Sequence, residues 1–142
     1  MVSTESDVST LFHRRSEAME MKDIDRLMAV YSPDIVYFDL VPPLRYAGIA
    51  ALRARFLDWF GRWEGAIGLE TRDLSVLESG DVAAAHMLIR ASGTLKDGRD
   101  VGYWVRTTNG CQRSDDGWLI THEHVSLPVD MASSRAVMDL QP

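Results

Sequence analysis

The chain has 142 residues, which is enough for one domain with one sizeable core and too few for two. Apolar residues make up 46%, charged residues 25% and the net charge is −6, a balance typical of soluble globular proteins that argues against nucleic acid as a partner. Cys111 is the single cysteine, the start does not resemble a signal peptide and no run reaches about 18 apolar residues, so we expect a cytoplasmic protein without disulfides or membrane contact.

The first half of the chain predicts three helices and one strand. Apolar residues recur at helical spacing from Asp7 to Met21, and Arg15 lies on that apolar stripe. Asp23 is a favourable first residue for a second, short helix that we expect to end near Ser32-Pro33. A third amphipathic helix follows Gly48 and runs to about Trp63.

The strand of the first half lies between the second and third helices. It covers Ile35 to Val41, is rich in β-branched and aromatic residues, and carries Asp39 near its end. Pro42-Pro43 closes it, because proline has no N–H to donate to a neighbouring strand.

The second half predicts four long strands joined by tight turns. Asp-Gly and Gly-Asp pairs mark the turns, since these residues tolerate positive φ. The strands are expected at Ile67 to Leu77, Val82 to Leu95, Arg99 to Arg113 and Trp118 to Val129.

This order of elements predicts a single α+β domain. Successive hairpins give a mostly antiparallel, strongly bent, cone-shaped sheet, and the three helices of the first half are expected on its concave face around one pocket. We expect residues 1–142 to form one domain with its core at about 7–128. Residues 129–142 are interpreted as a C-terminal tail or a segment that packs on a partner.

Two stretches carry a resemblance to a known family. The first runs through Lys22-Asp23, Tyr31-Ser32-Pro33-Asp34 and Val36-Tyr37-Phe38-Asp39 to Gly48 and its helix, and the second is the strand from Asp115 to Ser126. Their order and spacing resemble the SnoaL-like and ketosteroid isomerase-like proteins of the nuclear-transport-factor-2-like superfamily, over about Asp7 to Pro128. The resemblance implies an apolar pocket for a hydrophobic small molecule, a homodimer, and no metal or other cofactor.

The resemblance makes Asp39 the first catalytic candidate, as a general base. A carboxylate that faces an apolar pocket is poorly solvated, which suits it to removing a proton α to a carbonyl. The structural alternative is that Asp39 accepts hydrogen bonds from the Pro42-Pro43 turn or pairs with an arginine.

Arg15 and Asn109 occupy the positions at which the isomerases place donors to an oxyanion. Arg15 is expected to pair with Asp39 or Glu17, to bind a substrate oxygen, or to extend to solvent. Asn109 is a candidate substrate-binding residue, although one residue of slippage moves the match to Thr108 or Gly110.

His122, His124 and Ser126 alternate along one strand, so the two-residue period of a strand places all three on one face. The resemblance directs that face into the pocket, with His122 and His124 as catalytic candidates and Ser126 as a substrate-binding residue. The alternative is that the histidines only tie strands together. His86 on a neighbouring strand is a further substrate-binding candidate, and His-x-His is too weak a pattern to predict a metal site.

Tyr103 and Trp104 are adjacent on one strand and therefore face opposite sides of the sheet. Only one of them is able to line the pocket. We take Tyr103 as the substrate-binding candidate, and we expect the residue on the other side at a contact between two copies of the chain.

Three functions are compatible with these residues. The leading hypothesis is an isomerase, cyclase or lyase that needs no cofactor and acts on a hydrophobic carbonyl compound. The second is a non-catalytic domain that binds an apolar ligand. The third is water addition to an epoxide, which in this fold requires an Asp-Arg-Asp arrangement; Asp39 and Arg106 are two candidate members and the third has no candidate.

Overall fold

The computed structural model describes residues 7–142. Its elements follow one another in the order helix, helix, two strands, helix and six strands. They are α1 (Asp7–Glu20), α2 (Ile24–Met28), β1 (Tyr31–Phe38), β2 (Tyr46–Ala47), α3 (Ile49–Gly61), β3 (Trp63–Ser79), β4 (Val82–Leu95), β5 (Asp100–Ser114), β6 (Gly117–Ser126), β7 (Val129–Asp130) and β8 (Arg135–Ala136).

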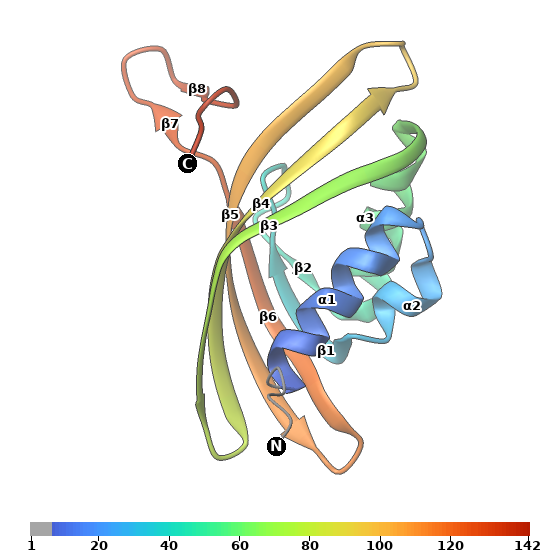
Figure 1. Cartoon of the computed structure of the whole chain (residues 1–142), viewed down its shortest axis with the longest axis vertical. Coiled ribbons are helices and arrows are strands. Elements are labelled where there is room, and N and C mark those ends of the chain that lie inside the picture. The colour runs from blue at the N-terminus through green and yellow to red at the C-terminus, as the bar shows by residue number, and fades with distance from the viewer. Residues whose placement is uncertain (1–6) are drawn as a thin grey trace, which may run out of the picture.

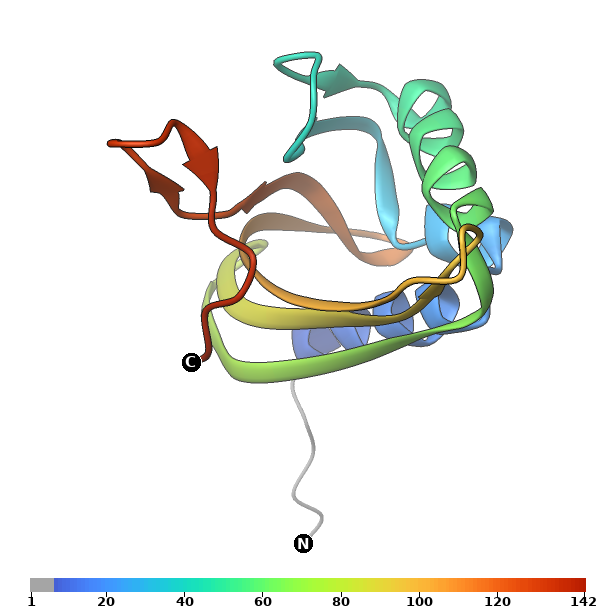
Figure 2. The ribbon, with the colours of Figure 1, turned by 90° about the horizontal axis from the view of Figure 1, so that it is seen from above.

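The first six strands form one sheet in the order β2-β1-β6-β5-β4-β3. The pairs β3–β4, β4–β5, β5–β6 and β1–β2 are antiparallel, and β1 lies parallel to β6. Figure 1 shows the long strands bending together, with the three helices on one side of the sheet, and Figure 2 shows the strands curving around an interior. The predicted α+β fold with a strongly curved sheet is confirmed.

The helices form where the sequence supplies an apolar face and a beginning. In α1, Val8, Leu11 and Phe12 are buried together with Ala18 and Met19. The Asp23 carboxylate caps α2 by accepting a hydrogen bond from the N–H of Arg26. Gly48 precedes α3 with φ of 90°, a conformation that favours glycine.

The second helix is shorter than predicted and the strand after it is longer. The helix α2 ends at Met28, and β1 begins at Tyr31, which pairs with Ile120 of β6. The sequence predicts Tyr31 in the helix, because it extends the apolar spacing of that helix. Its pairing with a strand distant in sequence overrides that local pattern.

A β-bulge in β6 changes which side chains face the interior. Ile120 pairs with Cys111, but the next pair is His122 with Gly110, so Thr121 is an extra residue on its strand. Trp118 and Ile120 are buried before the bulge, and the buried positions after it have odd numbers. The bulge therefore moves every following side chain of β6 to the opposite face.

The C-terminal segment folds back as the small hairpin β7–β8, which Figure 1 shows projecting beyond the sheet. The N–H of Val137 donates to the carbonyl of Pro128 at 2.8 Å, which closes the base of the hairpin. The next residue, Met138, contributes to the wall of the cavity described below. Residues 129–138 are thus part of the folded structure.

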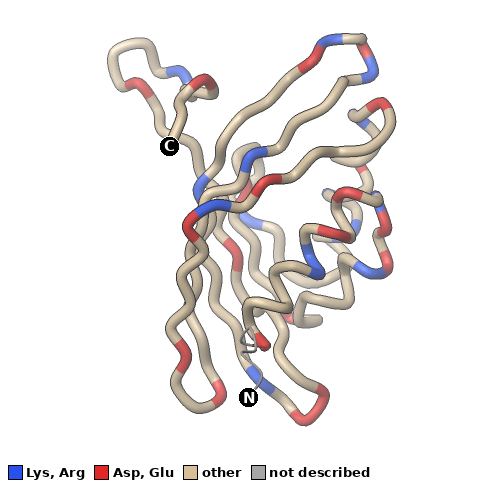
Figure 3. Tube along the Cα trace, viewed as in Figure 1, with Lys and Arg blue, Asp and Glu red and all other residues tan. Residues whose placement is uncertain are grey.

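Charged residues of both signs are interspersed on the helices and at the hairpin turns (Figure 3). The core between the helices and the concave face of the sheet is made largely of apolar side chains from the helices and from alternate strand positions. Within residues 7–142, no helix has the length and apolar character needed to cross a membrane.

Gly93 on β4 packs closely against the beginning of β3, and its replacement tests that packing. Its φ is 151°, and an added Cβ would lie 3.1 Å from the Trp63 ring and 3.2 Å from the Ala66 carbonyl oxygen. We expect Gly93→Ala to lower the free energy of unfolding by about 1–3 kcal/mol, through backbone strain and overpacking. Urea unfolding followed by tryptophan fluorescence measures the change.

Gly61 provides the matched control, because it ends α3 and an added Cβ there meets nothing within 4 Å. Gly61→Ala is expected to leave the free energy of unfolding unchanged or to raise it by up to about 1 kcal/mol. Equal stabilities of the two variants would show that this packing accommodates a side chain at position 93.

Candidate functional site

One cavity of about 660 Å³ lies between the concave face of the sheet, α3, the loop after β1 and the C-terminal segment. Its walls are mainly apolar and aromatic. These wall residues include Phe56, Trp59, Trp63, Leu69, Ile89, Leu95, Val101, Val105 and Val125. The Trp59 and Trp63 rings meet edge to face, with centroids 5.8 Å apart. The volume suits a small organic molecule of one to a few rings.

The inner end of the cavity holds a buried ion pair. Arg15 of α1 and Glu123 of β6 both line the cavity, and they are 0% and 1% exposed. Nη1 of Arg15 donates to Oε1 of Glu123 at 2.6 Å, and the Tyr31 hydroxyl donates to the same oxygen at 3.1 Å. The pair joins the first helix to the centre of the sheet.

Burial and neighbouring charges shift the pKa values of Arg15, Tyr31 and Tyr37. Burial is the largest single influence and lowers the pKa of the Arg15 guanidinium, but Glu123, through its charge and its hydrogen bond, acts together with Tyr31 and Tyr37 to outweigh it, so the pKa is raised. Burial, followed by the Glu123 charge, raises the pKa of Tyr31 and of Tyr37 well above the usual value. At neutral pH Arg15 is thus a cation and both phenols are neutral.

Tyr37 connects the inner end with the mouth of the cavity. It pairs in register with Glu123 across β1 and β6, and Asp39 follows two residues later along the chain. Two residues of extended chain span roughly 7 Å. The carboxylates of Glu123 and Asp39 therefore belong to the same face of the sheet, with the Tyr37 ring on the wall between them.

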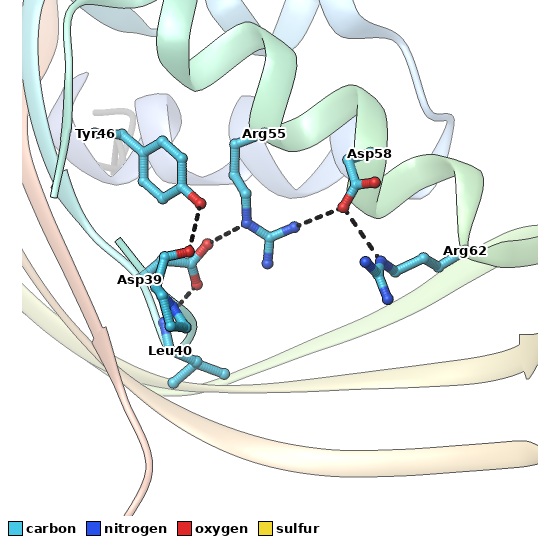
Figure 4. A network of polar contacts seen from close by, with 7 residues as sticks. Asp39, Leu40, Tyr46, Arg55, Asp58 and Arg62 are labelled. Atoms are coloured by element: carbon cyan, nitrogen blue, oxygen red, sulfur yellow. Dashed lines mark hydrogen bonds and ion pairs between the residues drawn. The ribbon is translucent and has the colours of Figure 1, made fainter. Parts of the chain in front are cut away.

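The mouth carries a second, partly exposed polar network (Figure 4). Nε of Arg55 donates to Oδ2 of Asp39 at 2.7 Å, and Nη1 of Arg55 lies 3.5 Å from Oδ2 of Asp58. Asp58 also accepts from Nε of Arg62 at 3.2 Å. The side chains of Asp39 and Arg55 are 11% and 15% exposed, whereas Asp58 is 58% exposed. The arginine thus joins a sheltered carboxylate to a solvated one.

The Asp39 carboxylate is held on both oxygens. Its Oδ1 accepts from the N–H of Leu40 at 2.6 Å, while Oδ2 is bound by Arg55. The predicted alternative that Asp39 pairs with an arginine describes the geometry correctly, and the carboxylate also lines the cavity. Tyr103 of β5 lines it as well, and burial raises the pKa of its phenol, so it is a neutral donor at neutral pH.

After Thr121, the side chains of β6 that face the cavity are not the ones predicted from the sequence. The expectation that His122, His124 and Ser126 point into the pocket is wrong, because Glu123 and Val125 line it. The reason is the bulge at Thr121, which ends the simple alternation assumed from the sequence.

These side chains lie on the convex face of the sheet. Nδ1 of His122 is 2.8 Å from the carbonyl oxygen of Val36, and the Phe38 ring meets His122 and His124 edge on. Oγ of Ser126 accepts from Nε of Arg106 at 3.1 Å. His86 is exposed on the same face, since the alternate residues of β4 are the buried ones. The predicted histidine constellation is therefore not part of the cavity.

Asn109 and Arg15 also differ in detail from the expectation. Asn109 is 2% exposed and its Nδ2 donates to Oγ1 of Thr107 at 3.4 Å, but it is not on the cavity wall. Arg15 pairs with neither Asp39 nor Glu17, because Arg55 binds Asp39 and Glu17 is exposed. Its full burial also excludes an extension to solvent.

Two residues of the site were not identified from the sequence. Alternation along the strand predicts an outward position for Glu123, between two histidines that are expected to face inward. The one signal for Glu123 in the sequence is Arg15, a charge on an apolar helix face that requires a buried partner. Arg55 lies on the polar face of the third predicted helix, so the apolar pattern gives no sign that it reaches the cavity. Its i, i+3 spacing to Asp58 is a signal for a side-chain pair, but that spacing does not reveal Asp39 as the third member.

Comparison with known proteins gives a family match and similar structures. A family model described as a SnoaL-like domain matches residues 8–130. A structure of an NTF2-like protein of unknown function from Pseudomonas putida KT2440 is 34% identical, covers 97% of this chain and 96% of that one, and has a TM-score of 0.88. A search of curated proteins gives no significant match.

More distant structures share the fold. A candidate dehydratase of the NTF2-like family from Streptomyces avermitilis is 23% identical over 84% of this chain and 93% of that one, with a TM-score of 0.73. A ketosteroid isomerase-like protein from Erwinia carotovora is 20% identical over 85% of this chain and 93% of that one, with a TM-score of 0.74.

The buried ion pair gives a stability prediction. Arg15→Met leaves Glu123 as an uncompensated buried charge and is expected to lower the free energy of unfolding by about 3–5 kcal/mol. The double variant Arg15→Met/Glu123→Leu removes both charges and is expected to recover most of that loss. Guanidinium unfolding followed by circular dichroism measures both changes.

The exposed pair of Arg113 and Asp81 is the control, with 47% and 70% of the two side chains exposed. Arg113→Met is expected to change the free energy of unfolding by less than about 1 kcal/mol. A double variant of the buried pair that is no more stable than Arg15→Met would contradict the assigned coupling.

Proposed function

Since the chain belongs to the SnoaL-like domain family, we propose that it is a small enzyme carrying out acid–base chemistry on a hydrophobic carbonyl compound, with Asp39 as the proton-transferring group. The observation that carries the proposal is the Asp39 carboxylate, 11% exposed on the wall of an otherwise largely apolar cavity. A carboxylate placed there has little competing water and direct access to a bound substrate.

The proposed reaction begins with proton removal. Oδ of Asp39 takes a proton from the carbon next to the carbonyl, the C–H bond breaks, and its electron pair passes to the carbonyl oxygen as an enolate. Return of the proton from Asp39 to another carbon gives isomerisation. Attack of the enolate carbon on a second carbonyl, whose oxygen then takes the proton from Asp39, gives cyclisation. Departure of a β-hydroxyl as water, with the same proton, gives dehydration. The chemistry of the substrate selects among these outcomes.

Arg55 and Tyr103 have supporting roles in this proposal. The Arg55 guanidinium fixes the orientation of Asp39 through the 2.7 Å contact to Oδ2. The Tyr103 phenol is protonated at neutral pH, because burial raises its pKa, and it is a donor for the developing enolate oxygen. His122 and His124 are not included, because their side chains lie on the convex face of the sheet.

A second candidate function is water addition to an epoxide. The Asp39–Arg55–Asp58 row supports it, because two carboxylates share one arginine at the cavity mouth. In that reaction one carboxylate removes a proton from water, the water oxygen attacks an epoxide carbon, and the other carboxyl group protonates the oxygen of the breaking C–O bond. Arg106, the candidate considered from the sequence, is on the convex face and binds Ser126.

Replacement of Asp39 tests the leading proposal. We expect Asp39→Asn to lower kcat by about 10²- to 10⁴-fold on any carbonyl substrate found, because the amide is not a base, while the ligand Kd changes little. Turnover is followed by chromatography across a panel of steroid, polyketide-like and aromatic carbonyl compounds, and binding by tryptophan fluorescence. Asp34→Asn is the control, since Asp34 is exposed on β1.

The results separate the enzyme from a binding domain. Loss of turnover in Asp39→Asn with unchanged folding and binding supports the proposal. A ligand that binds wild type and variant alike and is converted by neither points to a non-catalytic binding domain. Full turnover by Asp39→Asn would exclude Asp39 as the base.

Asp58→Asn separates the two reactions. Carbonyl chemistry that uses Asp39 alone is expected to keep kcat within about threefold, because the Asp58 side chain is 58% exposed and pairs with Arg55 and Arg62. Epoxide hydration needs both carboxyl groups, so the same variant is expected to lose about 10²-fold or more of that activity. Diol formation from small apolar epoxides is measured for wild type, Asp58→Asn and Asp39→Asn.

A further inference from the structure

The inner end of the cavity has hydrogen-bonding capacity that the protein itself leaves unused. Both described hydrogen bonds to Glu123 end on Oε1, one from Arg15 and one from Tyr31. Among residues 7–142, Oε2 of this carboxylate accepts no hydrogen bond. Because Glu123 lines the cavity, this oxygen is an acceptor for a group that enters it.

Arg15 adds an unused donor at the same place. Its Nη1 is bound to Glu123, and Nη2 lies 3.4 Å from the Met87 sulfur, which is a weak acceptor. Its Nε is buried and finds no acceptor in the described part of the chain. A buried N–H without a partner is costly, so an incoming acceptor is favoured beside the guanidinium.

The charge of the pair decides what kind of group fits. Arg15 and Glu123 neutralise each other, so the inner end offers one free acceptor and one free donor without net charge. A carboxylate entering it would face the Glu123 carboxylate and lose its own hydration. A ketone supplies only an acceptor, whereas a hydroxyl supplies both a donor and an acceptor.

We propose that the inner end of the cavity is a subsite for a hydroxyl group of an aromatic or alicyclic ligand, which donates to Oε2 of Glu123 and accepts from the Arg15 guanidinium, whose Nη2 has only the weak Met87 acceptor. The assignment rests on the proposed function in one respect, because it orients the substrate of the same cavity. It places the hydroxyl at the inner end and the reacting carbonyl near Asp39 at the mouth. The ring system between them packs on the aromatic and aliphatic walls.

A pair of probes with the same shape tests the subsite without turnover. 2-Naphthol and 2-methylnaphthalene differ only in a hydroxyl in place of a methyl group. A cavity without polar specificity binds the methyl compound more tightly, because its apolar surface is larger. We expect wild type to prefer 2-naphthol by about tenfold or more, since hydrogen bonds to charged groups are the stronger ones. Isothermal titration calorimetry gives both Kd values.

Two variants assign the preference to the inner end. In Arg15→Met/Glu123→Leu the order is expected to reverse in favour of 2-methylnaphthalene, with folding checked by circular dichroism. Glu123→Gln, which keeps the side-chain size and an acceptor but removes the charge, is expected to reduce the preference about threefold or more. Asp39→Asn is expected to keep the wild-type preference, because Asp39 lies at the other end of the cavity.

The outcomes are distinct from those for Asp39. A wild type that binds 2-methylnaphthalene as tightly as 2-naphthol overturns the subsite, and this comparison requires no variant to fold. A preference that persists in both inner-end variants, or that disappears in Asp39→Asn, also overturns it. Loss of turnover in Asp39→Asn is a separate readout, so the subsite and the assignment of the base fail independently.

Discussion

The ion pair of Arg15 and Glu123 constrains the rest of the molecule, because neither charge tolerates burial without the other. It requires α1 to present Arg15 to the centre of the sheet and β6 to present Glu123 on its concave face. The Tyr31 hydroxyl completes the arrangement from β1, the strand parallel to β6. One contact thus fixes the position of the first helix, the first strand and the last long strand relative to one another.

The bulge at Thr121 makes that contact possible. With unbroken alternation from Trp118 and Ile120, the concave face of β6 would carry His122 and His124, and Glu123 would face outward. The extra residue reverses the alternation, so that Glu123 meets Arg15 and the histidines meet Phe38 on the convex face. A single residue of register therefore decides which polar chemistry the cavity contains.

The cavity has a polar group at each end and apolar walls between them. The inner pair is fully enclosed, whereas the network of Asp39, Arg55 and Asp58 is open to water on one side. Enclosure favours a fixed hydrogen-bonding role for the inner end, and partial access at the mouth favours proton exchange with solvent. The two ends thus suit different tasks, orientation at Glu123 and proton transfer at Asp39.

The sequence by itself determined the order of elements, the curved α+β fold, the family and the place of Asp39, because apolar periodicity, Asp-Gly turns and the proline pair act locally. It also singled out Arg15 as a charge on an apolar face. Only the tertiary structure decided the partner of Arg15, the outward position of His122 and His124, and the pairing of Asp39 with Arg55. These depend on a bulge and on contacts between segments far apart in the chain, and no local pattern specifies the register of such contacts.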